Sequence, residues 1–149
     1  MKEFEQVEIL LVEDNATDAE ITMRALKKVN LGNRLVWVKD GAEALDFLLG
    51  LGEFSGKHYG TPRLVLLDIQ MPKIDGLEVL RQLRERDPLR RIPIVMMTSS
   101  AEESDLVRSY SLGVNSYLVK PVDFSKLADE VARLGFYWLV MNRLPGESK

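Results

Sequence analysis

The sequence contains no cysteine, which excludes disulfide bonds, thiolate zinc sites and cysteine nucleophiles. Its longest apolar runs fall far short of the ~20 residues that a membrane-spanning helix requires. Residues 1–5 hold no apolar stretch of the kind found in a signal peptide. Basic charge is not in excess either, since 20 Lys and Arg stand against 23 Asp and Glu, a balance that argues against an extended nucleic-acid-binding face. We therefore predict a cytoplasmic protein that binds neither a membrane nor nucleic acid.

The overall composition of the chain is that of one globular domain. The chain has 149 residues, of which 46% are apolar and 29% are charged, and this is enough apolar side chain to bury a single core. No internal repeat or low-complexity tract divides the sequence. We predict a domain over residues 7–141 and a short tail over residues 142–149.

Five short apolar runs alternate with segments of helical periodicity, a pattern typical of α/β proteins with a parallel sheet. The predicted strands cover residues 7–12, 35–38, 64–67, 94–97 and 117–119. Asn15, Asp40 and Asp75 each stand where a helix should begin, and their side chains can accept hydrogen bonds from the free backbone N–H groups there. A further helix should follow the fourth strand, and a last helix should run over about residues 123–141.

The carboxyl ends of the predicted strands carry acidic, hydroxyl and basic side chains that could form a reactive site. Ligands bind at these ends in parallel α/β sheets. Three carboxylates gathered there repel one another unless a cation lies between them, and hard oxygen ligands suit Mg²⁺. The residues that stand at the strand ends are Glu13, Asp14, Asp68, Thr98 and Lys120.

A carboxylate at such an edge can attack phosphorus and form an acyl phosphate. The transfer requires little beyond alignment and neutralisation of the charge on the phosphoryl oxygens. Lys120 and Mg²⁺ would supply the counter-charges, and the Thr98 hydroxyl would supply a hydrogen bond. Asp68 is the candidate nucleophile because it ends the predicted central strand, between the acidic pair and the lysine.

The order of these motifs along the chain resembles the receiver domain of two-component response regulators over roughly residues 7–134. The resemblance implies a doubly wound, flavodoxin-like α/β fold with a five-stranded parallel sheet in the order 2-1-3-4-5, to which the sequence of this chain adds an extended C-terminal helix. It also implies that a sensor histidine kinase phosphorylates Asp68. The motifs are Glu13-Asp14, Asp68, Met71-Pro72, Asp75-Gly76, Thr98 and Lys120-Pro121.

The same resemblance implies a role for each residue of the site. Asp14, Asp68 and the backbone carbonyl of Gln70 would bind Mg²⁺, and Glu13 would act mostly through metal-bound water. Lys120 would pair with the Asp68 carboxylate and then with the phosphate. The peptide bond between Lys120 and Pro121 would be cis.

The conformational switch of the family also has candidates in this chain. Thr98 would move towards the phosphoryl group, and Tyr117 would turn inward into the space that this movement leaves. An ordinary packing role for Tyr117 is an equally open alternative. Gln70 and Ser100 lie two residues past Asp68 and Thr98, where side chains can screen an acyl phosphate from water.

The predicted last helix is apolar on every side near its end, whereas a helix on the surface of a monomer should be apolar on one stripe only. We predict that this segment forms a homodimer interface. A bend at Gly135 that returns the helix onto its own core is the alternative. The aromatic extension and the long loop before Pro62 resemble the small stand-alone response regulators of bacterial and cyanobacterial phytochromes. The predicted interface residues are Phe136, Tyr137, Trp138, Leu139 and Val140.

The sequence thus predicts a single-domain response regulator that receives phosphate at Asp68 from a sensor histidine kinase, with a phytochrome as the candidate kinase. It would signal through protein contacts without a DNA-binding domain, and it would catalyse only its own phosphorylation and dephosphorylation. One alternative is a phosphatase of the haloacid dehalogenase type, which uses a second aspartate two residues after the nucleophile, where this chain has Gln70. Another is a scaffold that has lost phosphorylation, against which the complete acidic set argues.

Overall fold

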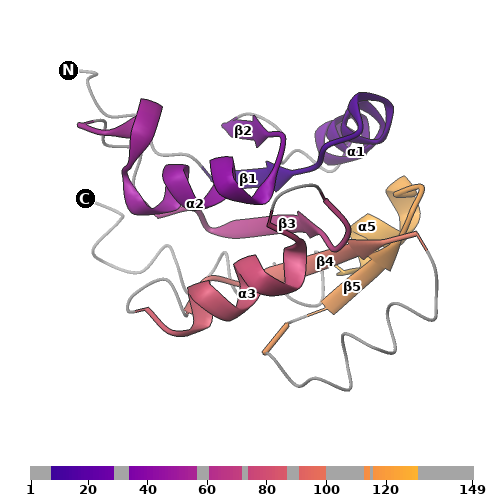
Figure 1. Cartoon of the computed structure of the whole chain (residues 1–149). Helices are drawn as coiled ribbons and strands as arrows, with labels where there is room; N and C mark the ends of the chain where they lie inside the picture. Colours follow the sequence, from indigo (N-terminus) through magenta and orange to yellow (C-terminus); the bar gives the residue numbers. More distant parts are fainter. Residues whose placement is uncertain are drawn as a thin grey trace, which may run out of the picture.

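A parallel sheet of five strands forms the centre of the molecule (Figure 1). The computed structural model describes residues 8–28, 34–56, 61–71, 74–86, 91–99, 113–114 and 116–130. The sheet has the order β2-β1-β3-β4-β5 and every pairing is parallel, which confirms the predicted fold. The strands are β1 (Ile9–Val12), β2 (Leu35–Val38), β3 (Leu64–Asp68), β4 (Ile94–Thr98) and β5 (Ser116–Val119).

Helices connect the strands and cover both faces of the sheet (Figure 1). Asn15, Asp40 and Asp75 each accept a hydrogen bond from the backbone N–H three residues later, at 2.8, 2.8 and 3.0 Å. These are the helix starts that capping chemistry predicts. The described helices are α1 (Ala16–Lys28), α2 (Gly41–Leu49), the short 3₁₀ helix η1 (Gly52–Phe54), α3 (Gly76–Arg84) and α5 (Phe124–Glu130).

Alternate side chains of the strands point to opposite faces of the sheet and fill two apolar layers. Leu10 and Leu67 belong to the layer between the sheet and helices α2 and α3. Leu11 and Leu66 belong to the layer between the sheet and helices α1 and α5. Strands β1, β3 and β4 are buried along their whole length, as central strands of a parallel sheet must be. Packing on both faces therefore fixes the carboxyl ends of these three strands.

The start of α3 is packed directly against the end of β3. A Cβ atom at Gly76 would lie only 2.2 Å from the backbone oxygen of Asp68 and 2.8 Å from the Cα of Ile69. The N–H of Gly76 donates a hydrogen bond of 3.0 Å to the carbonyl of Ile69. Only glycine fits this contact, and the helix thereby holds the backbone at the end of β3.

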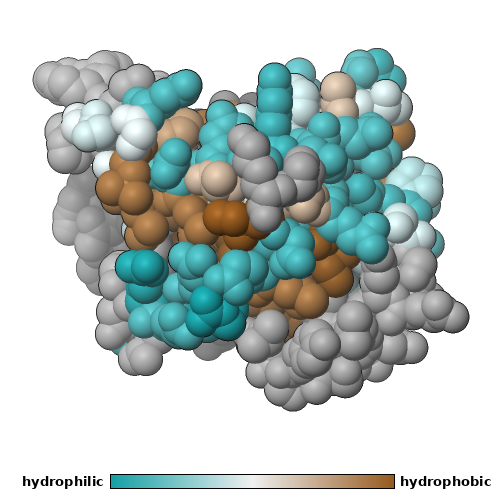
Figure 2. Space-filling view, viewed as in Figure 1, coloured by the Kyte–Doolittle hydropathy of each residue, from teal (hydrophilic) through white to brown (hydrophobic). Residues whose placement is uncertain are grey.

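The surface seen in Figure 2 mixes hydrophilic residues with hydrophobic patches, one of which lies over the carboxyl end of α2. Leu51, which follows that helix, is 50% exposed. Within the described ranges, no helix is both long enough and apolar enough to cross a membrane. The helix predicted after the fourth strand lies outside the described residues, as do the predicted interface residues Phe136, Tyr137, Trp138, Leu139 and Val140.

Candidate functional site

Three acidic side chains meet at the carboxyl edge of the sheet, where β1 and β3 end side by side. Glu13 and Asp14 follow β1, and Asp68 is the last residue of β3. One carboxylate oxygen from each of the three lies within 4.8 Å of the other two. Glu13 and Asp68 are buried, whereas Asp14 is exposed. The cluster therefore opens to solvent on the Asp14 side.

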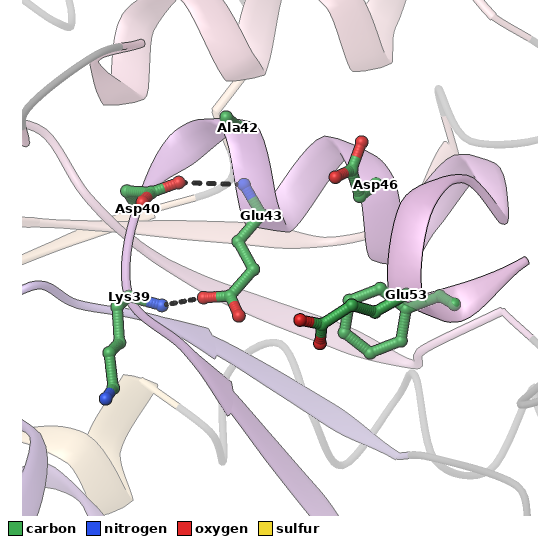
Figure 3. Close-up of a pocket in the computed structure, with 7 residues that line it drawn as sticks. Lys39, Asp40, Ala42, Glu43, Asp46 and Glu53 are labelled. Atoms are coloured by element: carbon green, nitrogen blue, oxygen red, sulfur yellow. Dashed lines mark hydrogen bonds between the residues drawn. The ribbon is translucent and has the colours of Figure 1, made fainter.

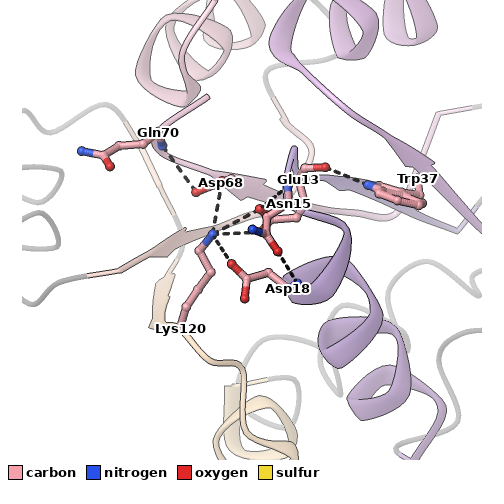
Figure 4. A network of polar contacts seen from close by, with 7 residues as sticks. All are labelled: Glu13, Asn15, Asp18, Trp37, Asp68, Gln70 and Lys120. Atoms are coloured by element: carbon pink, nitrogen blue, oxygen red, sulfur yellow. Dashed lines mark hydrogen bonds and ion pairs between the residues drawn. The ribbon is translucent and has the colours of Figure 1, made fainter. Parts of the chain in front are cut away.

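Lys120 brings a positive charge into this cluster from the end of β5 (Figure 4). Its Nζ lies 3.1 and 3.2 Å from the two carboxylate oxygens of Glu13 and 3.3 Å from Oδ2 of Asp68. A fourth contact of 3.2 Å reaches Oδ2 of Asp18 on α1. The backbone N–H of Lys120 donates to the carbonyl of Thr98 at 2.7 Å, and the bond to Pro121 is cis, as the resemblance implied.

The surroundings of Asp68 favour its protonated form when no other cation is present. Burial raises the pKa of Asp68 from 3.8 to about 7, and the nearby Glu13 carboxylate adds to the rise. Lys120 opposes this rise without cancelling it. Burial acts to lower the pKa of Lys120, but the Asp68 and Glu13 carboxylates outweigh it and hold that pKa above its usual value. Lys120 therefore stays charged at neutral pH.

The donor set fits a small hard cation such as Mg²⁺. Within the described residues Lys120 pairs with Glu13 and Asp68 of the cluster but not with Asp14, so a divalent cation would reduce the repulsion that remains among the three carboxylates. The carboxylate of Glu13 already accepts hydrogen bonds from Lys120 and from the backbone N–H of Asn15. The side chain of Asp14 makes no hydrogen bond or ion pair within the described residues, so its carboxylate would be available to a cation that also contacts the neighbouring Asp68. Gln70 lies beside them, since its N–H is 3.4 Å from Oδ1 of Asp68.

The remaining predicted site residues lie on the neighbouring strands. Thr98 is buried at the end of β4, one position beyond the pairing of Met97 with Asp68 on β3. Tyr117 is half-buried on β5, paired with Met96, and packs against the layer under α2 and α3. Thr98 therefore stands at the same edge as Asp68, whereas Tyr117 lies further from that edge. Pro72 and Ser100 lie outside the described residues.

Two residues of the site were not predicted from the sequence. Asp18 lies in the first turn of α1, and its carboxylate contacts Lys120. The sequence signal that could have indicated this contact is the position of Asp18 in the first helical turn after the acidic pair. Trp37 was expected only as part of the second strand, yet its indole Nε1 donates a hydrogen bond of 2.8 Å to the backbone carbonyl of Glu13. No pattern in the sequence indicates that contact.

A separate hollow of about 300 Å³ lies beside α2 and η1 (Figure 3). Two of its acidic residues already stabilise the start of α2, because Asp40 accepts from the N–H of Glu43 and Glu43 accepts from the N–H of Lys39. The hollow does not contain the predicted site residues. Its lining consists of Lys39, Asp40, Ala42, Glu43, Asp46, Glu53 and Phe54.

Comparison with known families agrees with this geometry. The model of the response regulator receiver domain matches residues 9–132. The chain belongs to this family. Receiver domains are signalling modules of two-component systems, and this membership decides against the phosphatase alternative.

Similar receiver proteins cover nearly the whole chain. The probable methanogenesis regulatory protein FilR2 of Methanothrix harundinacea is 47% identical over 93% of this chain and 87% of its own length. The response regulator Rcp1 of Synechocystis is 38% identical over 92% of both chains. The Mn²⁺-bound structure of Rcp1 matches with a TM-score of 0.71 and covers 89% of this chain and 94% of its own. The bacteriophytochrome response regulator AtBRR matches with a TM-score of 0.81 and 52% identity, covering 88% of this chain and 94% of its own.

Proposed function

We propose that this receiver domain accepts a phosphoryl group on Asp68 from a sensor histidine kinase. The observation that carries the proposal is the meeting of Asp68 with Glu13, Asp14 and Lys120 at one edge of the sheet. A buried carboxylate beside a fixed ammonium group is suited to nucleophilic attack on phosphorus, because the ammonium supplies one counter-charge and the two further carboxylates can hold a cation that supplies more.

In the proposed step, an oxygen of the Asp68 carboxylate attacks the phosphorus of a phosphohistidine. An O–P bond forms and the P–N bond breaks, and the imidazole leaves with the electron pair and takes up a proton. Lys120, 3.3 Å from Oδ2 of Asp68, neutralises negative charge on the carboxylate and then on the phosphoryl oxygens. The buried site allows these charges to interact more strongly than they would in water.

The proposal includes Mg²⁺ at the acidic cluster, where it would supply positive charge to the phosphoryl oxygens. Asp14, Asp68 and the backbone carbonyl of Gln70 would hold the ion, with Glu13 acting mostly through water. The short separation of the three carboxylates supports this assignment, and so does the existence of a Mn²⁺-bound form of the similar protein Rcp1.

Signalling would follow from a shift between two packings of the domain, biased by the new phosphate charge. Thr98 and Tyr117 are the proposed switch residues. The hydrogen bond from the N–H of Lys120 to the carbonyl of Thr98 supports a connection between the site and both strands, because Tyr117 lies three residues before Lys120 on β5.

The partners belong to the same proposal. A phytochrome kinase is the candidate donor, because AtBRR, which is 52% identical to this chain, is a bacteriophytochrome response regulator. The protein would act in the cytoplasm as a single domain over residues 7–141 with a tail over 142–149. It would form a homodimer through the C-terminal helix and signal by protein contacts.

Acetyl phosphate provides a direct test. With Mg²⁺ it should add one phosphoryl mass to the wild-type protein, and hydroxylamine should remove that mass because it cleaves acyl phosphates. Asp68→Asn should abolish the labelling. Asp75→Asn is the matched control, since an asparagine at the start of α3 keeps the cap and the variant should be labelled like the wild type. Labelling that persists in Asp68→Asn would contradict the proposal.

A further inference from the structure

The side chain of Trp37 connects the edge strand of the sheet to the acidic cluster. Trp37 lies on β2, paired with Leu11 of β1, and its indole N–H points to the loop that follows β1 (Figure 4). Nε1 is 2.8 Å from the backbone oxygen of Glu13, an ordinary length for a strong hydrogen bond. Strand β2 carries none of the three carboxylates. Through Trp37 it nevertheless contacts the backbone that carries two of them, Glu13 and Asp14.

The accepting carbonyl belongs to the peptide unit that joins Glu13 to Asp14. Because a peptide unit is planar, a bond that fixes this carbonyl also fixes the N–H and the Cα position of Asp14. Glu13 has further restraints, since its N–H donates to the Val38 carbonyl and its carboxylate contacts Lys120. The side chain of Asp14 makes no hydrogen bond or ion pair with other residues in the described part of the chain. The direction of Asp14 therefore depends on this backbone unit.

The indole ring is itself held in place. The Nζ of Lys39 lies 5.5 Å from the centroid of the Trp37 ring, within the range of a cation–π interaction. The ring is half-buried and packs against the apolar layer under α1 and α5. The N–H donor is consequently aimed by contacts that do not involve the site.

We propose that Trp37 is a positioning residue for the divalent cation of the receiver site. Its N–H holds the Glu13–Asp14 peptide unit in the orientation from which the Asp14 carboxylate faces Asp68. The inference rests on the proposed function, because it concerns the same cation and the same phosphorylation. Trp37 does not touch the reacting atoms, so it acts only on the binding of the cation.

Trp37→Phe tests the proposal because it keeps an aromatic ring and removes the N–H donor. Loss of one such bond should raise the Mg²⁺ concentration that gives half-maximal labelling by acetyl phosphate about 3- to 10-fold. The labelling rate at saturating Mg²⁺ should be unchanged. Direct Mn²⁺ binding, followed by the electron paramagnetic resonance signal of free Mn²⁺ without any phosphoryl donor, should weaken by the same factor.

Leu35→Ala is the matched control, because Leu35 lies on the same strand and packs against the same apolar layer without donating to the site. It should lower the midpoint of thermal unfolding and leave the Mg²⁺ dependence as in the wild type. If Trp37→Phe does not fold, a benzothienylalanine introduced at position 37 alone keeps the two-ring shape and replaces the N–H by sulfur, and it should weaken Mn²⁺ binding in the same way.

The outcomes separate the two proposals. A wild-type protein that is not labelled on Asp68 would contradict the proposed function. A labelled wild type whose Mg²⁺ and Mn²⁺ affinities are unchanged by loss of the indole N–H would overturn the role of Trp37 alone. That role would also be overturned if Leu35→Ala weakened Mn²⁺ binding as much as Trp37→Phe, because packing would then explain the effect.

Discussion

At the scale of single residues, the surroundings of Asp68 shift the pKa of its carboxyl group in opposite directions. Burial and the Glu13 carboxylate favour its neutral form, whereas Lys120 at 3.3 Å favours its charged form. The first two dominate and raise the pKa of Asp68 to about 7. A bound divalent cation would shift this balance towards the carboxylate, which is the form that can attack phosphorus.

The raised pKa of Asp68 predicts how stability depends on pH in metal-free buffer. The folded protein binds the Asp68 proton more tightly than the unfolded chain, whose pKa is near 3.8. The stabilisation is therefore complete below pH 3.8 and is lost as the pH rises through about 7. Asp68→Asn, which cannot ionise, should exceed the wild type in free energy of unfolding by an amount on the order of 4 kcal/mol at pH 8 and by less than half of that at pH 5.

Urea unfolding of both proteins in EDTA at pH 5 to 8 measures this difference. Addition of Mg²⁺ should reduce the gap at pH 8, because the cation binds the wild-type carboxylate and stabilises that folded state. A gap that does not change with pH would show that Asp68 titrates as an ordinary exposed aspartate.

At the scale of elements, the contact between β3 and α3 determines where Asp68 lies. Asp75 caps α3 through the N–H of Glu78, and Gly76 brings the first turn against the end of β3. The exposed ion pairs of Arg81 with Glu78 and Glu85 add little to stability, since water screens such pairs. The close approach at Gly76 is therefore the feature of α3 that matters most for the site.

Gly76→Ala should disturb both stability and the site. The new Cβ would meet the Asp68 carbonyl at 2.2 Å, so either α3 or the end of β3 must move. We expect a loss of about 2–3 kcal/mol in free energy of unfolding, as for other overpacked positions, together with slower labelling by acetyl phosphate. Urea unfolding and the labelling rate at saturating Mg²⁺ measure the two effects.

Gly50→Ala provides the control for this variant. Gly50 ends α2 with a φ of 71°, and among the described residues no atom outside its chain neighbours lies within 4 Å of an added Cβ. It should cost about 1 kcal/mol through backbone strain alone and leave the labelling rate unchanged. Equal labelling rates in Gly76→Ala and the wild type would contradict the role given to the β3–α3 contact.

At the scale of the whole molecule, the sequence predicts a homodimer through the apolar end of the last helix. Sedimentation of the wild-type protein at micromolar concentration should show a dimer, and Trp138→Glu should shift it to a monomer because a charge would be buried in the interface. Phosphorylation of Asp68 by acetyl phosphate should persist in the variant, since the site lies within one chain. A wild-type monomer at that concentration would contradict the predicted interface.

Much of the architecture was predictable because its causes act over a few residues. Strand periods and the caps at Asn15, Asp40 and Asp75 depend on neighbours at most four positions away, and the structure has all three caps. The edge where Glu13, Asp14, Asp68, Thr98 and Lys120 gather followed from the rule that parallel strands end on the same side. The strand order could not be predicted from local patterns, because they do not contain it, and only the family resemblance supplied it.

The sequence by itself determined which residues end the strands and which side chains start the helices, since propensity and hydrogen-bonding capacity belong to short segments. Only the tertiary structure decided that Lys120 reaches Asp18, 102 positions away, and that Trp37 donates to the Glu13 carbonyl, 24 positions away. The raised pKa of Asp68 also has a tertiary origin, because burial and charge depend on how the layers pack. Distances between atoms remote in the chain are set by the whole packing of sheet and helices, so no local pattern can specify them.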